Sequence, residues 1–78
     1  METAEEIVGL MNGANTATQA VNLAIGYLSQ NPKLIQNAAF FNALESALAG
    51  TDERAQRYQN EVLAIIPEEQ RRMVFFTN

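Results

Sequence analysis

The chain contains neither cysteine nor histidine among its 78 residues. The lack of cysteine excludes disulfides and thiolate metal sites, so packing alone must hold the fold together. The lack of histidine removes the commonest general base and the commonest transition-metal ligand. No serine or threonine therefore has a histidine to activate it, and no glycine spacing matches a dinucleotide-binding or P-loop motif. We expect a protein that is not an enzyme and that holds no cofactor and no metal.

Basic side chains are also scarce. Five lysine and arginine residues stand against nine aspartate and glutamate residues, which gives a net charge of -4. Nucleic acid is not an expected partner, because binding its backbone needs a cluster of basic groups that displaces counterions. Residues 1–6 are acidic where a secretory signal needs positive charge, and no apolar run approaches the roughly 20 residues that cross a bilayer. These features predict a protein that does not enter a membrane and that is cytoplasmic, or is delivered by a route that the sequence does not show.

Apolar residues, in contrast, are abundant enough for a folded core. They make up 47% of the chain and charged residues 18%, a composition typical of a globular protein rather than a disordered one. The length suits one domain, residues 1–78, near the size at which a single hydrophobic core is only just sufficient. Apolar positions recur at helical spacing and never alternate as in a strand. The predicted fold class is all-α, a compact bundle of four to five short helices.

Capping residues mark the first two helices. Thr3 followed three residues later by Glu6 is a capping-box pattern, and it predicts a short helix that ends at Asn12-Gly13. The next capping residue is Asn15 or Thr16, with Gln19 three residues after Thr16, and it predicts a second helix from about 16 to 30.

Proline and glycine mark the later helices. Pro32 suits the first position of a third helix, and Gly50 is expected to close that helix in the left-handed conformation. Thr51 is then expected to cap a fourth helix, which Pro67 ends. A short fifth segment is predicted from 68 to about 76.

Three pairs of adjacent acids are the strongest candidates for chemistry. Such pairs can bind Mg²⁺ or Ca²⁺ or act as acid and base, which keeps a small enzyme or metal protein as the weakest alternative. Each pair, however, falls in the expected first turn of a helix, where negative charge offsets the helix dipole. Glu53 and Glu68 also have an arginine four residues later, which predicts exposed ion pairs with Arg57 and Arg72. Capping and solvation are favoured for all three pairs, which are Glu5-Glu6, Asp52-Glu53 and Glu68-Glu69.

The middle of the chain is nearly free of charge. Between Ile7 and Leu44 the only charged residue is Lys33, although the segment should include one whole helix and most of another. A free-standing bundle normally carries charged residues on its outward faces. Two explanations stay open: a weakly polar exposed surface of Ala, Asn and Gln, or a surface covered by another protein chain, because the centres of interfaces are depleted in charge.

Aromatic residues suggest where a partner would bind. Phe41 shares a helical face with Leu34, Leu44 and Leu48, which leaves Phe40 beside that face, where it either widens the core or meets a partner. Tyr27 is a further candidate anchor, since aromatic residues dominate binding energies at interfaces. The apolar run near the end of the chain is expected to dock on another chain rather than its own. The predicted interface therefore comprises Tyr27, Phe40, Met73, Val74, Phe75 and Phe76.

Together these observations predict a non-enzymatic protein-binding module, an adaptor or inhibitor of a larger protein, that associates with another protein or with itself as a homo-oligomer. The main alternative is a structural subunit of a larger assembly such as a virion or a secretion apparatus.

Overall fold

The computed structural model describes residues 3–68, and within that range all the regular secondary structure is helical, with no strand. This confirms the predicted all-α bundle of short helices. Four α-helices form the fold, and short 3₁₀ helices precede the third and the fourth. In chain order the elements are α1 (Ala4–Asn12), α2 (Ala17–Gln30), η1 (Pro32–Gln36), α3 (Ala38–Ala49), η2 (Asp52–Arg54) and α4 (Ala55–Ile65).

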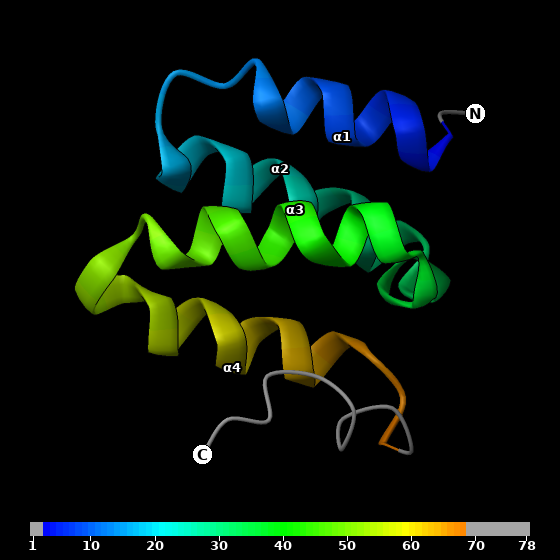
Figure 1. Cartoon of the computed structure of the whole chain (residues 1–78). Coiled ribbons are helices and arrows are strands. Elements are labelled where there is room, and N and C mark those ends of the chain that lie inside the picture. The colour runs from blue at the N-terminus through cyan, green and yellow to red at the C-terminus, as the bar shows by residue number, and fades with distance from the viewer. Residues whose placement is uncertain (1–2, 69–78) are drawn as a thin grey trace.

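Helices α2 and α3 form the centre of the bundle, and α1 and α4 flank them (Figure 1). Both outer helices contact both central ones. The resulting body measures 30 × 29 × 17 Å, so it is flat. Each of the four α-helices has both buried and exposed residues, so each has one side on the core and another in solvent.

The first two helices begin where their caps predict. The hydroxyl of Thr3 accepts a hydrogen bond from the Glu6 backbone N–H at 3.2 Å, and the Glu6 carboxylate accepts one from the Thr3 N–H at 2.8 Å. The capping box is therefore complete. At α2 the Thr16 hydroxyl accepts from the N–H of Gln19 at 3.1 Å. These bonds satisfy donors that the first turn of a helix leaves without partners.

The predicted continuous third helix is wrong, because the segment divides at Asn37. Residues Pro32–Gln36 form the 3₁₀ helix η1, Asn37 takes an extended conformation (φ -80°, ψ 122°), and α3 begins at Ala38. The Asn37 side chain accepts a hydrogen bond from the N–H of Phe40 at 3.0 Å, so Asn37 is the N-cap of α3. A local side-chain bond here competes successfully with continuation of the helix.

The turn after α3 also differs from the prediction. Gly50 keeps a right-handed conformation (φ -84°), and the left-handed residue is Asp52 (φ 54°), a residue type that tolerates this region better than most. Thr51 caps no helix start: its buried hydroxyl donates to the carbonyl oxygen of Leu48 at 2.7 Å, and α4 begins only at Ala55.

Gly50 is needed for space rather than for backbone freedom. A Cβ atom at position 50 would lie 2.8 Å from the Cβ of Ala17, closer than two carbon atoms can pack. The end of α3 thus touches the start of α2, and the missing side chain permits that contact.

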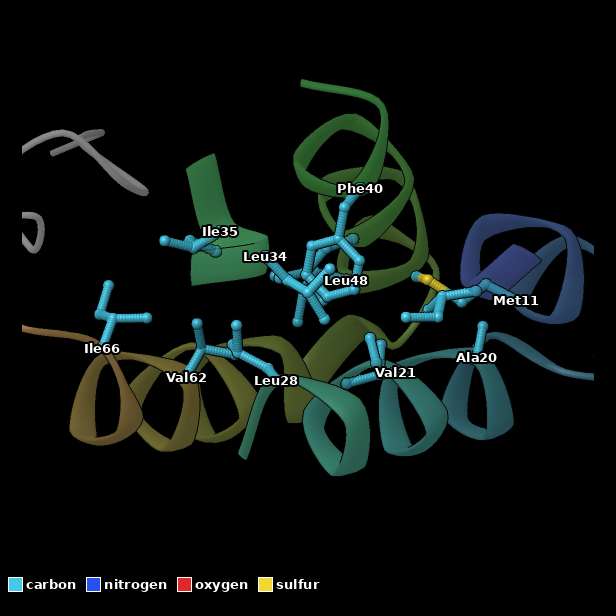
Figure 2. Close-up of a cluster of buried hydrophobic side chains, with 13 residues drawn as sticks. Met11, Ala20, Val21, Leu28, Leu34, Ile35, Phe40, Leu48, Val62 and Ile66 are labelled. Atoms are coloured by element: carbon cyan, nitrogen blue, oxygen red, sulfur yellow. The ribbon is translucent and has the colours of Figure 1, made fainter. Parts of the chain in front are cut away.

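One continuous core lies between the helices. Figure 2 shows the ring of Phe40 entering the middle of the cluster from α3, with Met11 of α1 at one end and Ile66 at the other. Ile66 follows α4 in an extended conformation before Pro67, so this helix ends where predicted. The predicted fifth segment lies almost wholly outside the described residues. The buried core residues are Ile7, Met11, Ala20, Val21, Ala24, Leu28, Leu34, Ile35, Phe40, Leu44, Leu48, Val62 and Ile66.

Candidate protein interface

The acid pairs that fall within residues 3–68 serve helix ends or solvent. Glu6 is held by the capping box described above. Asp52 and Glu53 lie exposed in η2, at the turn before α4. Across the described residues, no group of three or more acidic, histidine or cysteine side chains lies close enough to hold a metal ion. Glu69, the second acid of the last pair, lies outside this range.

The ion pair predicted between Glu53 and Arg57 does not form. Arg57 pairs with Glu61 at 3.6 Å, one turn further along α4. The reason is that Glu53 belongs to η2, so the spacing of four residues does not place it on the same helical face as Arg57. The Arg57 side chain is 79% exposed and that of Glu61 is 43% exposed, and pairs so accessible to solvent contribute little stability.

The candidate nucleophiles have structural or solvent-exposed positions. The Ser29 hydroxyl donates to the carbonyl oxygen of Ile25 at 2.9 Å within α2, a back-bonding geometry common for serine inside helices. Lys33 is exposed at the start of η1, as expected for a residue directly after a helix-starting proline. Neither arrangement supplies a base beside a nucleophile.

The structure corrects one predicted interface residue and leaves others beyond its range. Phe40 is completely buried, with 0% of its surface exposed, so it belongs to the core and to no binding surface. The break at Asn37 causes this difference, because it resets the helical phase: Phe40, Leu44 and Leu48 share the inner face, and Phe41 is half-buried beside it.

Tyr27 is half-buried and packs against the core from α2. It is thus only in part available to a partner. The four remaining predicted interface residues, Met73, Val74, Phe75 and Phe76, lie outside the described residues.

Two leucines that the sequence did not single out form a better candidate surface. Leu10 is 44% exposed and Leu23 is 37% exposed, and within residues 3–68 they are the only large hydrophobic side chains open to solvent. They lie on one shallow groove between the end of α1 and the first half of α2. We call this surface the α1–α2 face, and define it by the residues that line the groove: Leu10, Gly13, Ala14, Gln19, Asn22 and Leu23.

The α1–α2 face carries no charged residue. The nearest acid along α1 is Glu6, one turn before Leu10, and its carboxylate turns back to accept the hydrogen bond from Thr3. The polar groups on the face are the carboxamides of Gln19 and Asn22. Gln19 also accepts a hydrogen bond from the backbone N–H of Asn15 at 3.0 Å through its side-chain oxygen, which holds it at the start of α2.

The positions of Leu10 and Leu23 relative to the buried residues of their helices could have revealed their exposure. The core side of α1 is set by Ile7 and Met11, which are four residues apart, and that of α2 by Ala20, Val21, Ala24 and Leu28. Leu10 precedes Met11 by one residue and is therefore rotated by about 100° from it. Leu23 is displaced from Ala24 in the same way. Both leucines fall at the edge of their helix's buried stripe.

A second shallow depression lies where the α1–α2 loop meets α3. It is lined mainly by small and uncharged side chains, among them Ala17, Ala43, Ser46 and Ala47. No titratable group is present in its wall, so it offers no acid–base chemistry.

Comparison with known proteins adds no assignment. No protein-family model, curated protein or solved structure matches the chain. No helix in residues 3–68 combines the length and the apolar character needed to cross a membrane.

Proposed function

We propose that this protein is a non-enzymatic binding module that associates with a second copy of itself through the α1–α2 face. The observation that carries the proposal is the pair of exposed leucines, Leu10 and Leu23, in a groove without charge. Burying such side chains in an interface removes apolar surface from water, the main favourable term in protein association.

The charge of the chain favours a second copy approaching by this face. At a net charge of -4, two copies repel each other. Residues 45–68 carry seven of the charged side chains, whereas the α1–α2 face carries none. Contact through this face therefore removes no charged side chain from water.

The polar groups of the face are also self-complementary. The carboxamides of Gln19 and Asn22 each contain donors and an acceptor. In a two-fold symmetric dimer the same patch occurs on both sides, so each amide meets groups of its own kind. Because the α1–α2 face offers only two large apolar side chains, Leu10 and Leu23, we expect a weak, concentration-dependent dimer rather than an obligate one.

The test is size exclusion with light scattering over a range of concentrations, combined with helicity measurements. The wild type should shift from monomer to dimer mass as concentration rises. Leu23→Lys should remain monomeric and keep its helicity, because a buried, unpaired ammonium group opposes association. Ala64→Lys is the matched control, since it adds the same charge at an exposed position of α4 and should dimerise like the wild type.

Three outcomes contradict the proposal. A wild type that is monomeric at all concentrations overturns self-association and favours an adaptor or inhibitor of a different protein. Growth into rings or filaments favours the alternative of an assembly subunit, because an interface that does not close continues to add copies. A Leu23→Lys variant with the wild-type mass assigns association to another surface.

The predicted role of the terminal apolar run, Met73, Val74, Phe75 and Phe76, in association is tested separately. Truncation after Arg72 removes residues 73–78. If these residues contribute to association, the truncated chain should keep its helicity and form less dimer. A truncated chain that forms as much dimer as the wild type, or that unfolds, contradicts their role in the interface.

A further inference from the structure

The end of α1 contains the only Asn-Gly dipeptide of the chain, Asn12-Gly13. Asparagine followed by glycine is the pair most prone to spontaneous deamidation, because the residue after the asparagine has no side chain to obstruct its backbone nitrogen. Asn12 is exposed, so water reaches its side chain. We propose that Asn12 is a self-modification site, and that the last turn of α1 controls how fast it reacts.

The reaction needs only the peptide and water. The Gly13 nitrogen attacks Cγ of Asn12 and loses its proton as the new C–N bond forms. The bond from Cγ to Nδ2 breaks, ammonia leaves, and a five-membered succinimide remains. Water then adds to one of the two ring carbonyls and opens the ring, leaving aspartate or isoaspartate at position 12.

In the folded helix this attack is blocked. Asn12 is the last residue of α1, and a helical backbone directs the following nitrogen away from the side chain. The Gly13 N–H also donates to the carbonyl oxygen of Gly9 at 3.0 Å, and the Ala14 N–H donates to that of Met11 at 3.1 Å. The ring can close only after the last turn opens and the bond from Gly13 to Gly9 is broken.

The last turn of α1 should open often enough for deamidation to be measurable in the folded protein. Helix α1 has nine residues and includes Gly9 within its last turn, and glycine weakens a helix interior. Ends of short helices open with small free energies compared with a whole core. Burial of the Ile7 and Met11 side chains in the core opposes this opening of the helix end.

Two glycine substitutions separate the reactivity of the Asn12-Gly13 dipeptide from the effect of helix α1 on the reaction rate. In Gly13→Ala the new Cβ lies 3.5 Å from the Gly9 carbonyl oxygen, an ordinary contact, so the fold tolerates it while the reactive dipeptide is lost. In Gly9→Ala the new Cβ has no atom within 4 Å. This second variant leaves Asn12-Gly13 unchanged and stabilises the turn that covers it.

The experiment follows deamidation by intact mass at mildly alkaline pH, in buffer and in concentrated guanidinium, with peptide mapping and enzymatic isoaspartate labelling. The isoaspartate label should be found in the peptide of residues 1–33, which ends at Lys33 and contains Asn12. The folded wild type should react at least about tenfold more slowly than the unfolded chain. Gly9→Ala should slow the folded protein by a further factor of roughly two to five and leave the unfolded rate unchanged. Gly13→Ala should suppress the reaction in both states.

The proposal is overturned by any of three results. Equal rates in buffer and in guanidinium mean that the helix exerts no control. Equal folded rates for the wild type and Gly9→Ala assign the control to something other than the last turn of α1. Isoaspartate that persists in Gly13→Ala places the reaction elsewhere in the chain.

Discussion

The two ends of the described chain use their surfaces in opposite ways. Helix α4 has the composition of a solvated helix, with Arg57 and Glu61 paired on its outside and Val62 buried on its inside. Helices α1 and α2 have no charged residue beyond Glu6, and they leave Leu10 and Leu23 exposed. Hydrated charged groups keep a surface free of contacts. The outer side of α4 therefore faces water, and the contrast is the basis for proposing the α1–α2 face as the surface that a second copy covers.

The largest expected effect concerns the core that both ends share. Phe40→Ala removes a completely buried ring from the centre of the cluster, and we expect it to lower the free energy of unfolding by about 3 to 5 kcal/mol. Phe41→Ala, at the adjacent half-buried position, should lower it by less than half as much. Chemical denaturation followed by circular dichroism measures both. Equal losses would mean that the core does not depend on the phase set at Asn37.

Two glycines of the central helices, one within α2 and one at the end of α3, should change stability with opposite sign. Gly50→Ala places a Cβ 2.8 Å from that of Ala17, and such overpacking should destabilise the fold by about 1 to 3 kcal/mol. Gly26→Ala fills open space on α2, and it should stabilise the fold by about 0.5 to 1 kcal/mol because alanine favours a helix interior. Thermal and denaturant unfolding of the two variants gives the signs directly. A stabilising Gly50→Ala would show that α2 and α3 do not approach closely.

The smallest effect is expected in the charged region. Arg57→Ala removes the exposed pair with Glu61, and it should change the free energy of unfolding by no more than about 0.5 kcal/mol. Unfolding at low and high salt checks this, because an exposed pair weakens as salt rises. A loss of more than about 1 kcal/mol would contradict the view of α4 as a helix that simply faces solvent.

The sequence predicted most of the fold because its signals are local. Thr3 and Thr16 cap their helices through bonds to residues three positions later, and such spacing is visible in a linear sequence. Gly50 behaved differently, since its role depends on Ala17, which is 33 positions away in the chain (50 minus 17). No local pattern reveals that contact.

The interface prediction failed at Phe40 for a related reason. Pro32 starts a helix, as its position indicates, but that helix is a 3₁₀ segment that ends before Asn37. A 3₁₀ helix has three residues per turn and an α-helix 3.6, so residues on either side of Asn37 do not share one phase. Counting straight through from Leu34 selected Phe41 as the core ring. Counting from the Asn37 cap selects Phe40, which is the buried ring.

The contact between Ala17 and Gly50 has a consequence for how this sequence can diverge. The two positions share a single volume, so the size of one residue limits the size of the other. A descendant chain with alanine at position 50 should carry glycine at 17, and one with serine or larger at 17 should keep glycine at 50. In an alignment of relatives, the residues at positions 17 and 50 are expected to vary together. A double substitution that exchanges the two residues should be tolerated better than Gly50→Ala alone.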